Sequence, residues 1–192
     1  MTQTIRREEI LSPEIFSNLR NKELQEIIRI KKIRRLSTRT FSFLFENRET
    51  VLNQINEMVM IENVHEEEEV RRLIDVYSDL LPQNDTLSVS MFIEISDEKA
   101  LLRELPRLSG VEKEVYITFD GSEVHADPED GRSTDVLEST LQYLKFRFSR
   151  ENIEKFQNSS YVYVETRKEG YRESARIEGS LLKSLKSELE LN

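Results

Sequence analysis

The sequence contains no cysteine, and this absence excludes several kinds of chemistry. The chain can form no disulfide, offers no thiolate nucleophile, and cannot ligate an iron–sulfur cluster or a sulfur-based zinc site. Histidine occurs only at His65 and His125, so a histidine-rich metal centre is excluded as well. We therefore expect this chain to bind no metal ion and no cofactor.

Glycine, proline and long apolar runs are also scarce. Five Gly and four Pro among 192 residues indicate few long irregular loops. No apolar run approaches the roughly 20 residues that cross a bilayer, and the first residues lack the apolar core of a signal peptide. We expect a soluble, cytoplasmic protein with no membrane partner.

Charge is abundant and unevenly distributed. The net charge is −9, but residues 1–40 carry ten Lys or Arg and five Asp or Glu, whereas the other 152 residues carry 18 and 32. A basic segment on an acidic body can steer a protein partner or hold two subunits together. We expect a homodimer; the alternative is a helix whose basic face is simply solvated.

Hydrophobic periodicity predicts alternating strands and amphipathic helices. Phe41, Phe43 and Phe45 alternate along a strand over 40–46, and Asp120-Gly121 predicts a tight hairpin turn within 114–126. Further strands are expected at 86–96, 140–149, 161–167 and 171–177. Helices are expected at 13–36, after Asn47, and at 66–80, 96–105, 149–156 and 179–190.

Each expected strand has one apolar face and one mixed face, which favours an α+β fold. We predict an antiparallel or mixed sheet of about six strands with helices mainly on one face. A single domain spans 1–192, with a basic helical N-terminal segment at 1–39 and an α+β body at 40–192. In the first helix, Ile30 and Ile33 drift away from the face of Leu24 and Ile27. This helix therefore either contacts two neighbours or breaks near residue 20.

The junction between the first strand and its helix carries the polar residues of interest. Asn47 is placed to cap the helix, and Glu46 and Arg48 flank it. Gln54 and Glu57 stand one turn apart beside the apolar stripe, and Glu62 lies near the helix end. These six residues, Glu46, Asn47, Arg48, Gln54, Glu57 and Glu62, are the predicted ligand-binding cluster. The structural alternative is a capped helix whose charged residues pair with neighbours or extend to solvent.

The mixed faces of the strands raise a second hypothesis, RNA binding. An open sheet face with aromatic rings and cations can stack and hold single-stranded bases. The acidic body and the lack of an RNP-type motif argue against it, so we do not expect a nucleic-acid partner. The residues concerned are Phe92, Tyr116, Tyr143, Lys145, Arg147, Tyr161 and Tyr163.

The segments "LFENRETVLNQINEM", "LSVSMFIEISDE" and "GRSTDVLESTLQYLKF" carry a family resemblance. In order and spacing the chain resembles bacterial domain-of-unknown-function family 3501 over nearly its whole length. Members of that family are often encoded beside a rubrerythrin-like protein and an iron–sulfur protein resembling heterodisulfide reductase. The resemblance implies a link to peroxide or thiol redox physiology, and it implies no catalytic residue.

These observations give one leading hypothesis and two alternatives. Without P-loop, G-x-G-x-x-G, G-x-S-x-G or H-E-x-x-H motifs, the common nucleotide, redox and hydrolase mechanisms have no support. We favour a non-enzymatic accessory or adaptor protein that binds a redox partner. The alternatives are a small-ligand enzyme or binding protein that uses Glu46, Arg48, Gln54 and Glu57, and RNA binding through the sheet face.

Overall fold

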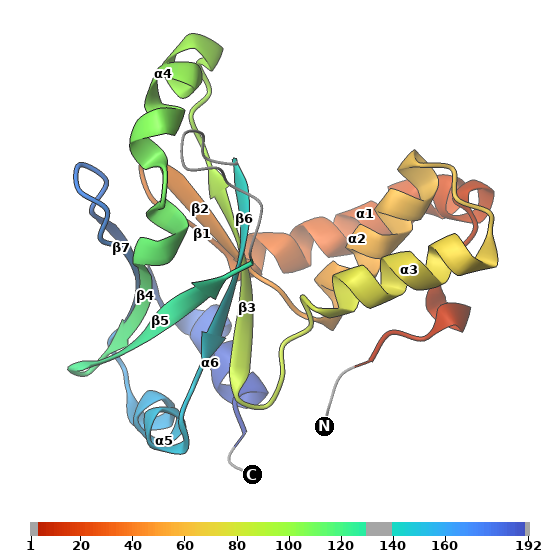
Figure 1. Cartoon of the computed structure of the whole chain (residues 1–192). Helices are drawn as coiled ribbons and strands as arrows, with labels where there is room; N and C mark the ends of the chain where they lie inside the picture. The colour runs from red at the N-terminus through yellow and green to blue at the C-terminus, as the bar shows by residue number, and fades with distance from the viewer. Residues whose placement is uncertain (1–3, 130–139, 191–192) are drawn as a thin grey trace. The chain divides into compact units, whose positions relative to one another are not determined.

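The computed structural model describes residues 4–129 and 140–190 (Figure 1). The chain forms two compact units: unit 1 comprises residues 1–34 and 46–83, and unit 2 comprises residues 35–45 and 84–192. The elements of unit 1 are η1 (Arg7–Glu9), α1 (Pro13–Arg34), α2 (Arg48–Ile61) and α3 (Glu67–Ser78). The elements of unit 2 are β1 (Arg35–Ser37), β2 (Phe41–Phe45), β3 (Thr86–Ile93), α4 (Glu98–Leu108), η2 (Val111–Glu114), β4 (Val115–Phe119), β5 (Ser122–Pro128), β6 (Leu141–Arg147), α5 (Arg150–Asn158), β7 (Val162–Thr166), β8 (Glu173–Ile177) and α6 (Gly179–Glu188).

Unit 1 is built from the predicted helices. Pro13 opens α1, and the Ser12 hydroxyl accepts the backbone N–H of Ile15 at 3.4 Å, because the first N–H groups of a helix need acceptors. α1 runs unbroken to Arg34 and packs on α2, which in turn packs on α3. Phe16 of α1 and Val51 and Ile55 of α2 are buried. Of the two predicted forms of the first helix, the continuous one is present.

The end of α1 differs from the prediction. The helix was expected to reach residue 36, but β1 begins at Arg35 and pairs antiparallel with β2. The backbone N–H of Thr38 donates to the carbonyl of Phe41 at 2.8 Å and closes the turn between them. The local pattern "IKKIRRL" continues a helical period, whereas pairing with β2 supplies the hydrogen bonds that make a strand.

The sheet of unit 2 has eight strands, not about six, in the order β1-β2-β3-β6-β5-β4-β7-β8. Neighbouring strands in this order all run antiparallel. The two edge strands, β1 and β8, also lie in contact, so the sheet curls into a nearly closed barrel. This confirms the α+β class and corrects the expectation of an open sheet under a layer of helices. A sheet that curls onto itself shields its own apolar face.

The core of unit 2 lies inside this barrel. The predicted Phe41, Phe43 and Phe45 row is buried there, together with apolar rows from the other strands. α4 lies at one end of the curved sheet, and α5 and α6 lie at the other (Figure 1). Leu108 of α4 and Phe156 of α5 reach the same core cluster. The helices therefore close the barrel ends rather than cover one broad face.

The strands follow two burial patterns. β4, β6 and β7 alternate between buried and half-exposed positions, as the sequence predicted. All five residues of β2 are buried, and β3 is buried on both faces from Thr86 to Met91, which the alternation did not predict. The Asp120-Gly121 hairpin is present, with φ of 44° and 80° at its two turn residues. Positive φ at both positions is what a two-residue turn of this type needs.

Candidate functional site

The predicted cluster in unit 1 is assembled only in part. Glu46 is 1% exposed. Its carboxylate accepts a hydrogen bond from the Thr50 hydroxyl and another from the Gln54 amide at 2.9 Å. Asn47 caps α2 as expected: its side-chain oxygen accepts the N–H of Thr50 at 3.0 Å. Glu46 and Gln54 are therefore brought together, and the carboxylate is held inside unit 1.

The other predicted residues pair elsewhere in unit 1. Arg48 binds the Glu9 carboxylate and donates to the Thr4 carbonyl at 3.1 Å. Both carboxylate oxygens of Glu57 accept a hydrogen bond from the Arg20 Nε–H, at 2.9 and 3.1 Å. Glu62 is exposed at the C-terminal end of α2. Ligand binding by these six residues stays a prediction, but five of them, all except Glu62, already have defined partners within the chain.

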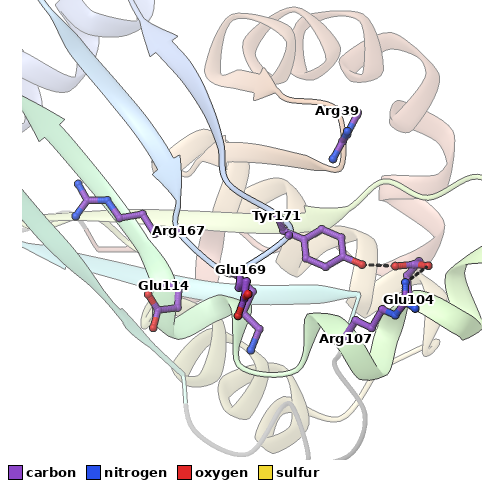
Figure 2. Close-up of a pocket in the computed structure, with 9 residues that line it drawn as sticks. Arg39, Glu104, Arg107, Glu114, Arg167, Glu169 and Tyr171 are labelled. Carbon is purple, nitrogen blue, oxygen red and sulfur yellow. Dashed lines mark hydrogen bonds and ion pairs between the residues drawn. The ribbon is translucent and has the colours of Figure 1, made fainter.

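A second polar region, in unit 2, was not predicted. A cavity of about 750 Å³ opens at the barrel end where α4 lies. Its lining comes from the turn between β1 and β2, from α4 and η2, and from the turn between β7 and β8 (Figure 2). We call this region the arginine cleft. Its residues are Arg39, Glu104, Arg107, Glu114, Arg167, Lys168, Glu169, Gly170 and Tyr171.

Tyr171 and Glu104 form the centre of the arginine cleft. The Tyr171 hydroxyl donates a hydrogen bond to the Glu104 carboxylate, and Figure 2 shows the ring pointing toward it. Burial, followed by this hydrogen bond, raises the pKa of Tyr171 to about 12. The same hydrogen bond, with Arg107 nearby, lowers the pKa of Glu104. At neutral pH the phenol is therefore a fixed donor and the carboxylate is ionised.

The arginines at the cleft rim are exposed and loosely paired. Arg107 contacts Glu104 at 3.4 Å with its side chain 73% exposed. Arg39 contacts Glu173 at 3.4 Å with its side chain 79% exposed. A guanidinium has five N–H donors, so each retains donors for a further group. This surplus makes the cleft able to hold a carboxylate or another acidic group.

Glu173 and Lys168 hold the two turns of the cleft in place. Glu173 accepts hydrogen bonds from the Thr40 N–H at 2.9 Å and from the Thr40 hydroxyl at 2.6 Å. Burial acts to raise the pKa of Glu173, but hydrogen bonds from Thr38 and Thr40 and the charge of Arg39 outweigh it, and the pKa is lowered. The Lys168 ammonium donates a hydrogen bond to the carbonyl of Ser109 at 2.7 Å. Ser109 is the C-terminal cap of α4, and a positive charge there interacts favourably with the helix dipole.

The outer sheet face carries arginines over the aromatic rings named in the RNA hypothesis. Arg167 lies 4.1 Å from the Tyr116 ring centroid, and Tyr116 also stacks on His125 at 4.7 Å. Arg176 lies 5.2 Å from the Tyr161 ring. Arg167 also binds Glu123 at 2.8 Å. The Tyr116 and Tyr161 rings already have cation partners, and RNA binding stays an untested alternative that the sequence did not favour.

Sequence reasoning missed the arginine cleft because its residues come from three distant segments. Arg39, Glu104 and Tyr171 meet only when β1 and β8 approach each other. The predicted strands at 161–167 and 171–177 were the one usable signal, since they placed a short charged loop between two strand ends.

The described residues contain neither a group of metal ligands nor a membrane-spanning helix. Within 4–129 and 140–190, no group of three or more His, Asp or Glu is placed to hold a metal ion. Among the helices in those ranges, none has both the length and the apolar character needed to cross a membrane.

Comparison with known proteins identifies a family and a similar solved structure. The family described as "Protein of unknown function (DUF3501)" matches residues 4–189. A crystal structure of a novel protein of unknown function from Burkholderia pseudomallei K96243 is similar, with 27% sequence identity and a TM-score of 0.89. That similarity covers 98% of this chain and 100% of the other chain. No curated protein matches the sequence.

Proposed function

We propose a function for this chain, which belongs to the DUF3501 family: it is a non-enzymatic accessory protein that binds an acidic segment of a redox partner. The observation that carries the proposal is the arginine cleft. Arg39 and Arg107 are largely exposed there and use long contacts of 3.4 Å each. An incoming carboxylate can take their remaining donors in shorter, charge-assisted hydrogen bonds.

The size and charge of the cleft favour a protein segment. The cavity is open, about 750 Å³ in volume, and lined by charged residues of both signs. Pockets for small molecules are mostly apolar with few polar groups, which this cleft is not. A protruding acidic side chain can instead meet the rim arginines while its backbone stays outside.

The protonation states in the cleft support binding over acid–base catalysis. A general acid or base works best when its pKa lies near the operating pH. Here the pKa of Tyr171 is raised to about 12 and that of Glu104 is lowered. Both shifts move these groups away from neutrality, so they act as a fixed donor and a fixed charge.

The redox link comes from the family resemblance. Rubrerythrin-like and heterodisulfide-reductase-like iron–sulfur proteins are the partners that it implies. This chain has no cysteine to carry thiols or a cluster, so we assign it the role of adaptor in the cytoplasm. The partner would carry the redox centre, and this chain would hold or position it.

Co-purification from the native host tests the partner. We expect the wild-type chain to recover the rubrerythrin-like or iron–sulfur protein, identified by mass spectrometry. Arg39→Glu/Arg107→Glu should lose it, because the cleft then repels a carboxylate. The matched control is Arg147→Glu/Arg150→Glu, which makes the same charge change in unit 2 near α5. Equal recovery by both double variants would refute the cleft as the binding surface.

A purified-component assay separates the cleft from the partner's identity. A fluorescent hexaglutamate peptide serves as the acidic probe, and anisotropy gives its Kd. We expect the Arg39→Glu/Arg107→Glu variant to bind about tenfold more weakly than wild type, with added salt weakening wild-type binding. If the peptide binds but no redox protein co-purifies, the cleft is supported as a binding site for acidic segments and the link to a redox partner is refuted.

A further inference from the structure

α1 carries an exposed stripe that its contacts within unit 1 do not explain. Ile15 is 51% exposed, Leu19 37% and Ile33 40%. An adjacent side of the helix, about 100° around its axis, packs on α2 and buries Phe16 and Ile27 (Figure 1). The sequence pattern predicted either a break or two neighbours for this helix, and the helix is continuous. α2 is one neighbour, and the exposed stripe is where a second one fits.

The stripe has the spacing of a coiled-coil seam. Its positions are separated alternately by four and three residues, which keeps them on one side of a helix with 3.6 residues per turn. Large apolar residues lie toward its two ends and charged residues lie between them. We call this stripe the α1 seam, and it consists of Ile15, Leu19, Lys22, Glu26, Arg29 and Ile33.

The α1 seam is complementary to itself when reversed. In an antiparallel pair with its two-fold axis level with Leu24, Ile15 faces Ile33 of the partner subunit. Lys22 then faces Glu26 of the partner subunit, and Leu19 faces the aliphatic stem of Arg29 of the partner subunit. Two-fold symmetry makes each contact twice. A parallel pair would instead place Lys22 beside the partner's Lys22, which like-charge repulsion disfavours.

We propose that the α1 seam is a homodimer interface in which two copies of α1 pack antiparallel. The occupant is a second copy of this chain, because the order of apolar and charged positions along the seam matches its own reverse. The Arg29 guanidinium already holds Glu26 at 2.7 Å. The exposed Lys22 adds an opposite charge from the partner subunit, so Glu26 lies between two cations in the dimer.

The first experiment measures the mass of the full chain by light scattering coupled to size exclusion. We expect dimer at about 100 µM, with dissociation on dilution, because one helix pair is a small interface. Ile33→Glu should give a monomer, since the change places a charge against Ile15 of the partner subunit. Val76→Glu is the matched control: Val76 lies on α3, also in unit 1, and is 59% exposed. Circular dichroism of both variants checks that each remains folded.

A charge exchange tests the pairing itself. Lys22→Glu should raise the dimer Kd by about tenfold, because two symmetric ion pairs become repulsive. Lys22→Glu/Glu26→Lys restores opposite charges across the axis and should recover most of the affinity. A monomeric wild type, or a double variant as weak as the single one, would refute the proposed interface.

Cross-linking tests the register. Because the chain has no cysteine, each introduced cysteine is unique. Lys22→Cys and Glu26→Cys proteins mixed under mild oxidation should form a disulfide between the two variants. Lys22→Cys alone should cross-link far less, because these positions are offset along the axis by four residues, or about 6 Å. Equal cross-linking by Lys22→Cys alone would contradict the antiparallel register.

Discussion

Tyr171 sits where the two turns of the arginine cleft meet α4, and its hydroxyl serves the cleft only while it is protonated. The phenol donates to Glu104 and packs against Phe41 at a centroid distance of 6.4 Å. Its ring therefore belongs to the core, and its hydroxyl belongs to the site. The hydrogen bond lowers the pKa of Glu104, and burial together with the same hydrogen bond raises the pKa of Tyr171.

Tyr171→Phe tests this hydrogen bond through its pH dependence. The pKa of Tyr171 is raised from 10.0 to about 12 in the folded state, so its contribution to stability is complete below pH 10 and is lost as pH rises through 12. The lowered pKa of Glu104 contributes stability above 4.5, and this is lost as pH falls. We therefore expect the Tm difference between wild type and Tyr171→Phe to be largest from about pH 6 to 9.

Thermal melts of both proteins from acid to alkaline pH provide the measurement. Glu104→Gln is the companion variant, because it replaces the carboxylate by a neutral and weaker acceptor and should bring the Tyr171 titration, followed by phenolate absorbance, back toward 10.0. Burial remains in that variant, so the return should be partial. Equal Tm values for wild type and Tyr171→Phe at every pH would show that Tyr171 contributes by packing alone, because Phe retains the ring.

Single residues were predictable where the cause was local. Asn47 could be identified as a cap because its acceptor lies three residues before the N–H that it binds. The sequence could predict that Arg48 pairs with some carboxylate, but not that the carboxylate is Glu9, because the two residues lie 39 positions apart. Tyr171 and Glu104 lie 67 positions apart, and nothing near either residue indicates the other.

Helix α2 shows how one element combines capping with packing. Asn47 and Thr50 exchange hydrogen bonds at its first turn, at 2.9 and 3.0 Å, which satisfies groups that the helix leaves free. Val51, Ile55 and Val59 then place one apolar stripe in the core of unit 1. The polar junction quoted from the sequence thus begins an element whose stability depends on its first turn.

Replacing the cap should cost stability in a predictable order. Asn47→Ala removes the acceptor for the Thr50 N–H, and we expect the free energy of unfolding to fall by about 1 kcal/mol. Asn47→Ser retains an acceptor and should lose only a fraction of that. Urea denaturation followed by circular dichroism gives both values. Equal loss in Ala and Ser variants would mean that Asn47 acts through a contact other than the cap.

Elements were predicted best where period, cap and turn agreed. The Asp120-Gly121 hairpin combined a turn signal with an alternating pattern, and the helix predicted at 149–156 begins at Ser149, which caps α5. β1 was missed because three residues give too short a pattern to overrule a helical run. Its existence depends on pairing with β2, and a strand of that length has little stability by itself.

At the scale of the whole molecule, the chain order is interleaved with the two units. β1 and β2 belong to unit 2, yet they lie in the sequence between α1 and α2 of unit 1. Closure of the barrel therefore requires strands encoded before residue 46 to meet strands encoded after residue 84. Pairing between strands so far apart in the sequence produces no pattern within either strand. The sequence therefore indicated the α+β class but neither the eight strands nor their order.

The interleaving predicts which part of the chain folds alone. A fragment of residues 84–192 lacks β1 and β2, so it leaves β3 as an open edge and loses Phe41, Phe43 and Phe45 from the core. Truncating one buried Phe costs about 3–5 kcal/mol, and a whole domain has only about 5–15 kcal/mol in total. We therefore expect this fragment to show no cooperative thermal transition.

A second fragment, residues 35–192 with about eight Gly or Ser residues replacing 46–83, keeps all eight strands and should melt cooperatively. Cooperative melting of residues 84–192 would show that β1 and β2 are dispensable, and failure of the linked fragment would show that unit 2 needs the helices of unit 1 to fold.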